Sequence, residues 1–385
     1  MTASRLKVVV LGAGMVGKEI AKDLARRFDV TAVDRSKDVL SAAFAGRPGR
    51  SVKTRRADLG SAAALRRVVS PADIVVGALP GFMGRAALET IVRAGKPVVD
   101  ISFFPEDPFE LDDLAKAKGV TAIVDMGVAP GMGNVFAGYH HKRMKALDRL
   151  EIVVGGLPVV REFPFEYKAP FSPHDVIELY TRPARYVENG VPVVRPALSD
   201  PELMFVEGVG TLESFNTDGL RTLARTITCP NMRERTLRYP GHIRLMQALR
   251  DVGFFDPTPI DVGGTPIAPL DFTARLVFPK WRLGEREEEF TVVRLTIEGT
   301  TPRGRRERIT YDLLDRYDHA TGATSMARTT GYTCAAAVHL LADGAFSRPG
   351  ICPPEYVGED EACFRFLLQY LEARGVRYRR TVTPL

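Results

Sequence analysis

The stretch VVVLGAGMVGKEIAKDL, residues 8–24, decides the fold class of this protein. A β-branched run comes first, the glycines of a G-x-G-x-x-G pattern follow at Gly12, Gly14 and Gly17, and apolar residues then recur at helical spacing. A strand, a glycine turn and a helix in this order are typical of the unit that binds a dinucleotide. The stretch therefore predicts an α/β fold.

The segments that follow alternate between strand and helix patterns. Strands are expected at 30–33, 55–58, 74–78, 97–101 and 121–125, and helices at 62–69, 86–94 and 111–118. Right-handed crossovers join strands that alternate with helices in this way. The alternation therefore predicts a Rossmann-type, doubly wound parallel sheet.

A second kind of pattern begins after the turn VAPGMGN at 128–134. Longer runs of alternating apolar residues predict antiparallel strands, at 150–158, 272–278 and 290–299. The charged run RGRRER at 303–308 is expected to form a solvated hairpin tip, and the small and apolar residues of 326–341 predict a helix. We therefore expect a second domain of the α+β class.

Composition excludes several classes of function. The chain has 385 residues, enough for two or three domains at roughly 150 residues each. The 53 Lys and Arg residues exceed the 47 Asp and Glu residues by only 6 and are spread along the chain, so nucleic acid is not an expected partner. No apolar run is long enough for a membrane span, and no secretion signal precedes the first strand. The four cysteines lie far apart without a C-x-x-C pair, so we expect no metal site, reduced thiols and a cytoplasmic location.

The glycine pattern and the acid that follows it predict a cofactor site. Gly12 permits the tight turn, Gly14 lets the backbone approach a pyrophosphate at the helix N-terminus, and Gly17 lets the helix pack against the strand. Asp34 is expected to accept hydrogen bonds from ribose hydroxyls and to repel a 2′-phosphate, whereas Arg35 could pair with one. NAD is therefore the favoured cofactor, with NADP as an alternative.

Further cofactor contacts are expected in the loops at the carboxyl ends of the strands, where the coenzyme would pass. The segment GALPGFMG at 77–84 is one such loop, although an ordinary strand-to-helix turn explains it equally well. The expected contacts outside the glycines and Asp34–Arg35 are Met15, Val16, Asp58, Ala78, Leu79, Pro80 and Met83.

Several motifs together resemble the saccharopine dehydrogenase (reductase) family. They cover nearly the whole chain: DMGVAPGMGNVFAGY at 125–139, FEYK at 165–168, TLRYPGH at 236–242, DVGFF at 251–255 and ADGAFSRPG at 342–350. The resemblance implies a Rossmann domain at 1–126, an inserted substrate-binding and dimerisation domain at 127–335, and a C-terminal segment at 336–385 that returns to the Rossmann domain. It also implies a homodimer.

The RYPGH form of the motif is most similar to the lysine 6-dehydrogenases of that family. This similarity implies NAD-dependent oxidative deamination of the L-lysine side-chain amine to 2-aminoadipate 6-semialdehyde, which cyclises to a piperideine carboxylate. Two alternatives remain: a saccharopine-type or carboxynorspermidine-type reductase that uses NADP, or a dinucleotide-binding sensor without turnover. Fold alone does not separate an enzyme from a sensor.

Oxidation at an amine carbon requires a neutral amine, and a free lysine ammonium has a pKa near 10.4. A base is therefore needed. His242 is the first candidate because imidazole titrates near neutral pH, and Asp125 is the second because it ends a parallel strand. Tyr167 could donate a hydroxyl to the amine or imine nitrogen. Each of the three also has a structural interpretation, as a core histidine, a turn cap or a core tyrosine.

The carboxylate of an amino-acid substrate requires a fixed cation. An arginine offers a planar, bidentate fork, and Arg225 and Arg238 flank the motif region. Thr217 and Asp218 in the segment FNTDGL are expected to add polar contacts. Most arginines only solubilise a surface, so a structural role remains open for each.

Overall fold

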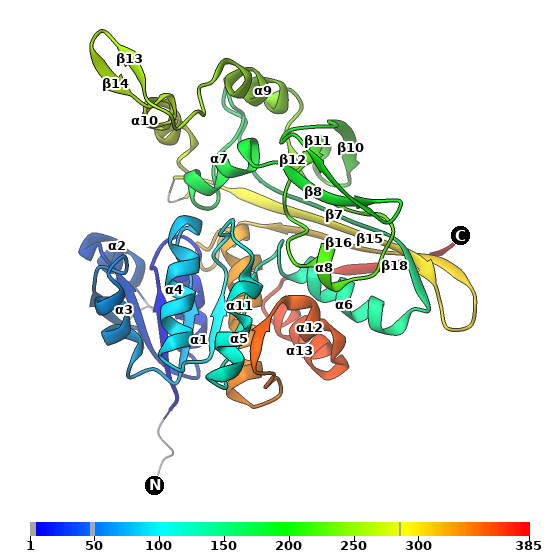
Figure 1. Ribbon diagram of the computed structural model, residues 1–385, viewed down its shortest axis with the longest axis horizontal. Coiled ribbons are helices and arrows are strands. Elements are labelled where there is room, and N and C mark those ends of the chain that lie inside the picture. The colour runs from blue at the N-terminus through cyan, green and yellow to red at the C-terminus, as the bar shows by residue number, and fades with distance from the viewer. Residues whose placement is uncertain (1–4, 47–50, 285) are drawn as a thin grey trace. The chain divides into compact units, whose positions relative to one another are not determined.

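The computed structural model describes residues 5–46, 51–284 and 286–385. The chain divides into two compact units (Figure 1). Unit 1 comprises Met1–Arg143 and Met326–Arg377, and unit 2 comprises Met144–Ser325 and Tyr378–Leu385.

Unit 1 is built on a seven-stranded parallel sheet with the strand order β17-β6-β5-β4-β1-β2-β3. Its strands are β1 (Lys7–Leu11), β2 (Asp29–Asp34), β3 (Lys53–Arg56), β4 (Ile74–Gly77), β5 (Val98–Asp100), β6 (Thr121–Ile123) and β17 (Gly350–Cys352). The central strand β1 is an apolar run that is almost entirely buried, as expected for a parallel sheet covered on both faces. The predicted doubly wound α/β class is therefore confirmed.

Helices connect these strands (Figure 1). They are α1 (Gly17–Leu24), α2 (Lys37–Phe44), α3 (Ala62–Val69), α4 (Gly81–Arg93), the 3-10 helix η2 (Pro108–Leu111), α5 (Asp112–Ala117), α6 (Met132–Arg143), α11 (Ser325–Ala342), α12 (Pro354–Glu359) and α13 (Glu361–Glu372). Serine hydroxyls cap two of the helix starts: Ser36 accepts the Val39 amide at 3.2 Å and Ser61 the Ala64 amide at 3.4 Å.

The C-terminal segment is held in unit 1 by a buried polar cluster. Tyr370 on α13 donates its hydroxyl to the carboxylate of Asp23 on α1 at 2.6 Å, and Arg374 Nε donates to both oxygens of that carboxylate at 2.9 Å. Strand β17 extends the parallel sheet beyond β6. The last residues behave differently, because β18 (Arg379–Pro384) pairs with a strand of unit 2. The segment 336–385 is thus shared between the two units.

Unit 2 contains a mixed nine-stranded sheet, with the order β10-β11-β12-β7-β15-β16-β18; β8 also pairs with β12, and β9 pairs with β8. The strands are β7 (Ala146–Pro158), β8 (Ala184–Glu188), β9 (Val191–Arg195), β10 (Glu202–Val206), β11 (Gly210–Asn216), β12 (Met232–Arg238), β15 (Glu289–Thr300), β16 (Arg306–Arg316) and β18. Of the predicted hairpin tip at 303–308, residues 303–305 lie in the turn between β15 and β16, whereas 306–308 are the first residues of β16. The helices are α7 (Pro173–Thr181), α8 (Leu223–Thr226), α9 (His242–Val252) and α10 (Pro269–Trp281), and a separate hairpin joins β13 (Ile260–Val262) to β14 (Thr265–Ile267).

The sequence prediction at 272–278 is wrong. The segment FTARLVF was expected to be a strand, but it lies within helix α10. Pro269 occupies the first turn, where its missing amide costs nothing, and the buried side chains are Thr273, Val277 and Trp281. That spacing of four residues is helical, and Trp281 lies outside the seven-residue window from which a strand was inferred.

The unit boundaries also differ from the expected positions 126 and 335. The first boundary lies after Arg143 because α6 packs against α12 within unit 1. The contact is close: a Cβ on Gly138 would lie 2.0 Å from the Glu355 carbonyl oxygen. The second boundary lies before Met326 because nearly all of α11 belongs to unit 1.

Candidate functional site

The loop between β1 and α1 leaves an open cradle at one glycine. Gly12 has a φ of 95°, and a Cβ there would lie 2.3 Å from the Ala78 carbonyl oxygen. A Cβ at Gly17 would lie 2.2 Å from the Gly12 carbonyl oxygen, whereas a Cβ at Gly14 would have no heavy atom within 4 Å. The fold itself therefore requires Gly12 and Gly17. The space over Gly14 fits a pyrophosphate that approaches the backbone at the start of α1.

Asp34 holds this loop against the second strand. Its Oδ2 accepts the Ala13 amide at 3.0 Å, and its Oδ1 accepts the Ser36 amide at 2.9 Å. A carboxylate has further lone pairs, so it can still accept from ribose hydroxyls. Two cations lie beside it, since Arg35 follows it directly and Arg56 Nε donates to the Arg35 carbonyl oxygen at 3.0 Å. Asp34, which would repel a 2′-phosphate, thus lies beside Arg35 and Arg56, which would attract one.

The remaining predicted cofactor residues lie around the same edge of the sheet. Met15 and Val16 form the turn before α1, and Ala78, Leu79 and Pro80 follow β4, which neighbours β1 in the sheet. Met83 lies in the first turn of α4, and its amide donates to the Pro80 carbonyl oxygen at 3.0 Å. Asp58 is exposed after β3, where its Oδ1 accepts the Gly60 amide at 3.0 Å.

Two buried acids follow neighbouring strands at the carboxyl edge of the sheet. Asp125 has a left-handed φ of 53° and comes just after β6, which ends at Ile123 and not at Asp125 as expected. Asp100 ends β5 and accepts the Ser102 amide at 2.8 Å and the Ser102 hydroxyl at 3.2 Å. A Cβ on Gly77 would lie 1.8 Å from the Asp100 carboxylate. Sequence reasoning missed Asp100, although an acid that ends the strand pattern VVD could have signalled it.

In unit 2, three of the predicted residues meet in one buried cluster. Arg238 on β12 stacks on the Tyr167 ring, 4.2 Å from its centroid, and its Nε donates to the Tyr180 hydroxyl at 3.0 Å. The Tyr180 hydroxyl lies 2.9 Å from His242 Nε2, and His242 Nδ1 lies 2.8 Å from the Phe165 carbonyl oxygen. A carbonyl can only accept, so Nδ1 carries the proton and Nε2 accepts from Tyr180. Sequence reasoning missed Tyr180, which links Arg238 to His242.

The sequence suggested that His242 titrates near neutral pH, but the structure places it in an environment that lowers its pKa. It is the first residue of helix α9 and is buried. Burial, together with the nearby Arg238 guanidinium, lowers the pKa of His242 to about 3. Burial also raises the pKa of Tyr167 above its usual range. The imidazole therefore remains neutral over the physiological range, with both ring nitrogens hydrogen-bonded.

A second buried polar group lies further along β12. Thr217 donates its hydroxyl to Glu234 and lies 2.9 Å from the Thr236 hydroxyl. Burial raises the pKa of Glu234 to about 7. Asp218 forms an ion pair with Arg185, with Nε and Nη2 each 2.8 Å from one carboxylate oxygen. Glu234 was also missed, although the alternating pattern RERTLR places it on the same face of the strand as Arg238.

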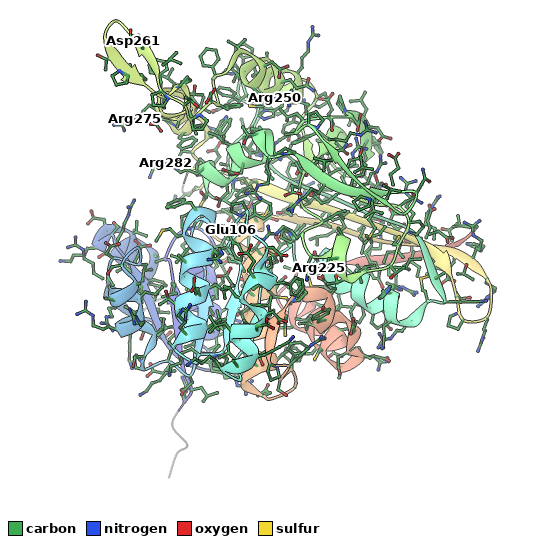
Figure 2. All side chains as sticks on the ribbon, viewed as in Figure 1. Glu106, Arg225, Arg250, Asp261, Arg275 and Arg282 are labelled. Carbon is green, nitrogen blue, oxygen red and sulfur yellow. The ribbon has the colours of Figure 1, made fainter. Side chains whose placement is uncertain are left out.

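The two arginines predicted to bind substrate occupy different environments. Arg238 is 2% exposed and forms no ion pair among the residues that the structure describes. Arg225 lies on the short helix α8 and is exposed (Figure 2). The exposed Arg225 is therefore accessible to a ligand, whereas Arg238 is buried against Tyr167 and Tyr180.

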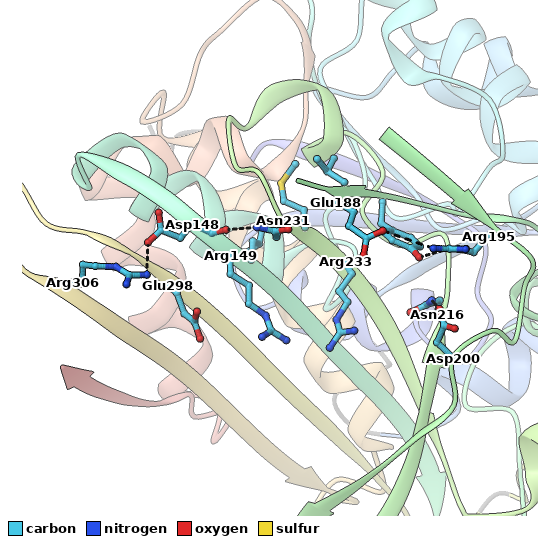
Figure 3. A pocket seen from close by; sticks show the side chains of 14 residues that line it. Asp148, Arg149, Glu188, Arg195, Asp200, Asn216, Asn231, Arg233, Glu298 and Arg306 are labelled. Atoms are coloured by element: carbon cyan, nitrogen blue, oxygen red, sulfur yellow. Dashed lines mark hydrogen bonds and ion pairs between the residues drawn. The ribbon is translucent and has the colours of Figure 1, made fainter. Parts of the chain in front are cut away.

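A charged groove of about 800 Å³ lies elsewhere in unit 2 (Figure 3). None of the predicted site residues lines it. Its charges are mostly paired within the protein: Arg306 lies 3.0 Å from Asp148, and Arg149 lies 2.8 Å from Glu151. The groove is therefore separate from the polar clusters described above.

In 5–46, 51–284 and 286–385, no three His, Cys, Asp or Glu side chains gather as metal ligands would. Within the same ranges no helix combines the length and apolar character that a membrane crossing needs.

Comparisons with known proteins agree with this geometry. The family model described as the saccharopine dehydrogenase NADP binding domain matches residues 8–123, and that described as the saccharopine dehydrogenase C-terminal domain matches residues 127–376. Saccharopine dehydrogenase [NADP(+), L-glutamate-forming] of Schizosaccharomyces pombe is 23% identical, over 97% of this chain and 98% of its own length.

Two solved structures share the fold. Apo saccharopine dehydrogenase (L-Glu forming) from Saccharomyces cerevisiae gives a TM-score of 0.78 at 19% identity, covering 98% of this chain and all of that one. Homospermidine synthase from Legionella pneumophila, solved with NAD, gives a TM-score of 0.65 at 12% identity, covering 98% of this chain and 91% of that one.

Proposed function

This chain belongs to the saccharopine dehydrogenase family of dinucleotide-binding oxidoreductases, and we propose that it oxidises the side-chain amine of L-lysine with NAD(P). The observation that carries the oxidoreductase part is the open cradle over Gly14, beside the Asp34 carboxylate. A glycine whose Cβ would meet nothing is not required for packing. It is required when a phosphate group comes close to the backbone.

Lysine and saccharopine are the two candidate substrates. The alignment with the fission-yeast enzyme extends over 460 positions, more than the 385 residues here, so that relative has residues with no counterpart in this chain. Saccharopine joins a lysine skeleton to a glutamate skeleton, and free lysine is the smaller of the two molecules. Saccharopine is the second candidate because the named relative acts on it.

The reaction breaks a C–H bond and makes a C=N bond. When bound, the nicotinamide accepts the hydride from the carbon that bears the amine, and the nitrogen loses a proton. Water then adds to the C=N bond and ammonia leaves, which gives the semialdehyde. The aldehyde cyclises with the α-amine to a piperideine carboxylate.

The residues of this chain divide the remaining tasks. We assign the amine and its proton to Asp125, because its carboxylate is positioned at the carboxyl edge of the parallel sheet, where doubly wound folds bind their ligands. For unit 2 taken by itself, Arg225 is the exposed one of the two arginines and is therefore the candidate for the substrate carboxylate. His242 and Tyr180 hold Arg238 in place under Tyr167. In this assignment His242 positions other groups and is not the base.

Turnover of an amine panel tests the proposal. The full chain is incubated with L-lysine, L-ornithine or L-saccharopine and either NAD or NADP, and the nicotinamide absorbance is followed. Turnover of lysine with ammonia release supports the proposal, and turnover of saccharopine alone overturns the lysine assignment. A Gly14→Val variant serves as the control for contaminating activity, since it should turn over nothing. No turnover of any amine would favour a binding protein without catalysis.

Replacement of Arg225 tests the carboxylate assignment. Arg225→Gln should raise the KM for the amino acid at least about tenfold, since a charge-assisted hydrogen bond contributes about 1.5–3 kcal/mol, with NADH affinity unchanged. Arg305→Gln, at the exposed tip of the β15–β16 hairpin, removes the same charge elsewhere and is the matched control. An unchanged KM in Arg225→Gln would remove Arg225 from the substrate site.

A further inference from the structure

The charged groove of unit 2 lies where the large sheet forks. Strand β12 pairs with β11 through residues 235–238 and with β8 at Met232, so β11 and β8 leave the same edge of β12 at different points. The groove of about 800 Å³ is lined by residues of both strands and of β7, β12 and β15 (Figure 3). Its volume lies in the range of sites that bind small molecules.

One side of the groove carries one positive charge more than its acids neutralise. Arg149 on β7 and Arg233 on β12 share the Glu151 carboxylate, which lies 2.8 Å from Nη2 of the first and 2.5 Å from Nε of the second. The next carboxylate, Glu202, lies 3.9 Å from Arg233 and also accepts from Arg235. Three guanidinium groups thus share two carboxylates. We call Arg149 and Arg233, which line the groove, its positive pole.

The other acids near the positive pole already have a base of their own. Glu298 lies opposite Arg149 in the register, but it accepts from Arg308 at 2.8 Å. Asp148 lies 3.0 Å from Arg306. Each of these pairs adds one acid and one base, so the excess of one positive charge remains.

A second group of lining residues carries one negative charge more than its bases neutralise. Glu188 and Asp200 are both exposed, and Arg195 is the lining base beside them (Figure 3). Arg195 lies 3.8 Å from Glu188, and its Nε donates to the Tyr186 hydroxyl at 2.9 Å. Asp200 forms no ion pair with any residue that the structure describes; its carboxylate accepts from Asn216 at 2.7 Å. We call Glu188 and Asp200 the negative pole.

A buried acceptor beside the negative pole lacks a partner. Asn216 ends β11, lines the groove and is 3% exposed, and its Oδ1 accepts no hydrogen bond from the described residues. Its Nδ2 donates to Asp200 and to the Ser199 hydroxyl, at 2.7 and 3.2 Å. A carboxylate can only accept, so the amide cannot turn round and offer Oδ1 to Asp200. A buried acceptor without a donor costs free energy, which a donor on a ligand would recover.

The two poles are separated by a distance that a small molecule can bridge. Asn216 lies directly opposite Arg235 in the register, and Arg233 lies two positions along β12 from Arg235, on the same face. Asn216 and Arg233 are therefore diagonal neighbours, about 7–8 Å apart. A carboxylate and an ammonium that are carried by one carbon fit between two such side chains, with a hydrogen bond of roughly 3 Å at each end.

We propose that this groove binds a free α-amino acid. The carboxylate of the ligand accepts from the guanidinium groups of the positive pole, and its ammonium donates to the negative pole and to Asn216 Oδ1. A zwitterion neutralises both poles, whereas a simple anion or cation would neutralise one and leave the other. None of the residues to which a part of the proposed reaction is assigned lines the groove, so the inference does not rest on that reaction.

Three ligands that differ by one charged group test the proposal on the full chain. L-Alanine carries both charges, propionate lacks the ammonium, and ethylamine lacks the carboxylate. Saturation-transfer NMR of the ligand methyl signals measures each affinity. L-Alanine should bind at least about tenfold more tightly than either of the others, because each of them lacks one set of charge-assisted hydrogen bonds.

Replacement of one pole at a time should cause two different losses. Arg233→Gln should abolish the preference for L-alanine over ethylamine and leave the affinity for ethylamine unchanged. Asp200→Asn should abolish the preference for L-alanine over propionate and leave the affinity for propionate unchanged. Damage to the fold would weaken all three ligands together, so the pattern separates recognition of charge from a structural role.

Two control variants locate the binding. Arg305→Gln removes an exposed charge at the tip of the β15–β16 hairpin, and Arg225→Gln removes the candidate for the substrate carboxylate. Neither should change the affinity for L-alanine. Propionate that binds as tightly as L-alanine would indicate an anion site only. That result, no saturable binding of L-alanine, or binding that is lost in Arg225→Gln but kept in Arg233→Gln would each overturn the proposal. No readout depends on turnover, so failure of the proposed reaction would leave this test intact.

Discussion

Replacement of Gly14 by valine separates cofactor binding from folding. A Cβ at this position has no heavy atom within 4 Å, and the backbone there is not in the left-handed region. The fold therefore accommodates the side chain, and the free energy of unfolding should change by less than about 1 kcal/mol. The same side chain fills the space over the loop that a pyrophosphate needs.

The expected loss of affinity follows from the contacts that the side chain blocks. A phosphate at the start of α1 accepts charge-assisted hydrogen bonds from backbone amides, each contributing about 1.5–3 kcal/mol. Loss of one or two such bonds, about 3 kcal/mol, corresponds to an increase of more than 100-fold in Kd. Calorimetric titration with NADH and NADPH measures the affinity, and chemical denaturation of the same variant measures its stability.

Two other glycines provide matched comparisons. Gly17→Ala places a Cβ 2.2 Å from the Gly12 carbonyl oxygen, so it should cost about 3 kcal/mol or more of stability. Gly46→Val also adds a Cβ to open space, but Gly46 follows the C-terminal end of α2, at the opposite edge of the sheet. This variant should change neither the affinity for NADH nor the free energy of unfolding. If folded Gly14→Val binds NADH as tightly as the wild type, the loop does not hold the pyrophosphate and the reasoning fails.

Two further predictions concern cofactor choice and pH. Asp34→Ser should shift the ratio of kcat/KM towards NADP, because it removes the repelling carboxylate and leaves Arg35 and Arg56 in place; an unchanged ratio would exclude Asp34 as the discriminating residue. The pKa of His242 is lowered to about 3, so its contribution to stability is complete above pH 6.5 and is lost as the pH falls. The pKa of Glu234 is raised to about 7, so its contribution is complete below pH 4.5 and is lost as the pH rises. Glu234→Gln removes the second contribution and leaves that of His242. As the pH is lowered from 6.5 to 5, the free energy of unfolding of this variant should therefore fall by up to about 1.4 kcal/mol per pH unit, more steeply than that of the wild type. A free energy of unfolding that does not change over this range would contradict a buried, neutral His242.

The geometry of the glycine loop could be predicted closely from the sequence. Gly12, Gly14 and Gly17 follow one another within six residues, and their roles depend on backbone geometry that such a short segment sets by itself. The family resemblance was also accessible, and the family models confirm it. The assignment to lysine and the preference for NAD remain predictions, because the named fission-yeast relative uses NADP and acts on saccharopine.

The surroundings of the residues that were predicted to contact substrate could be predicted only in part. The sequence singled out Tyr167, Arg238 and His242 separately, and the structure shows that they are neighbours. Their environment was not predictable, because the cluster is closed by Tyr180 from α7 and Trp281 from α10, far away in the sequence. Burial by those distant elements changes His242 from a group that titrates near neutral pH into a neutral hydrogen-bonding link.

The sequence by itself determined the parallel sheet, its order of alternation with helices and the glycine cradle, because these depend on side-chain periodicity and backbone freedom within a few residues. Only the tertiary structure decided that 272–278 is helical, that β17 returns to the parallel sheet of unit 1, and that β18 pairs with β16 in unit 2. The same holds for the charge state of His242 and for the exposure of Arg225. Burial and charge arise from contacts between segments far apart in the chain, and local patterns do not encode which distant surface covers a given side chain.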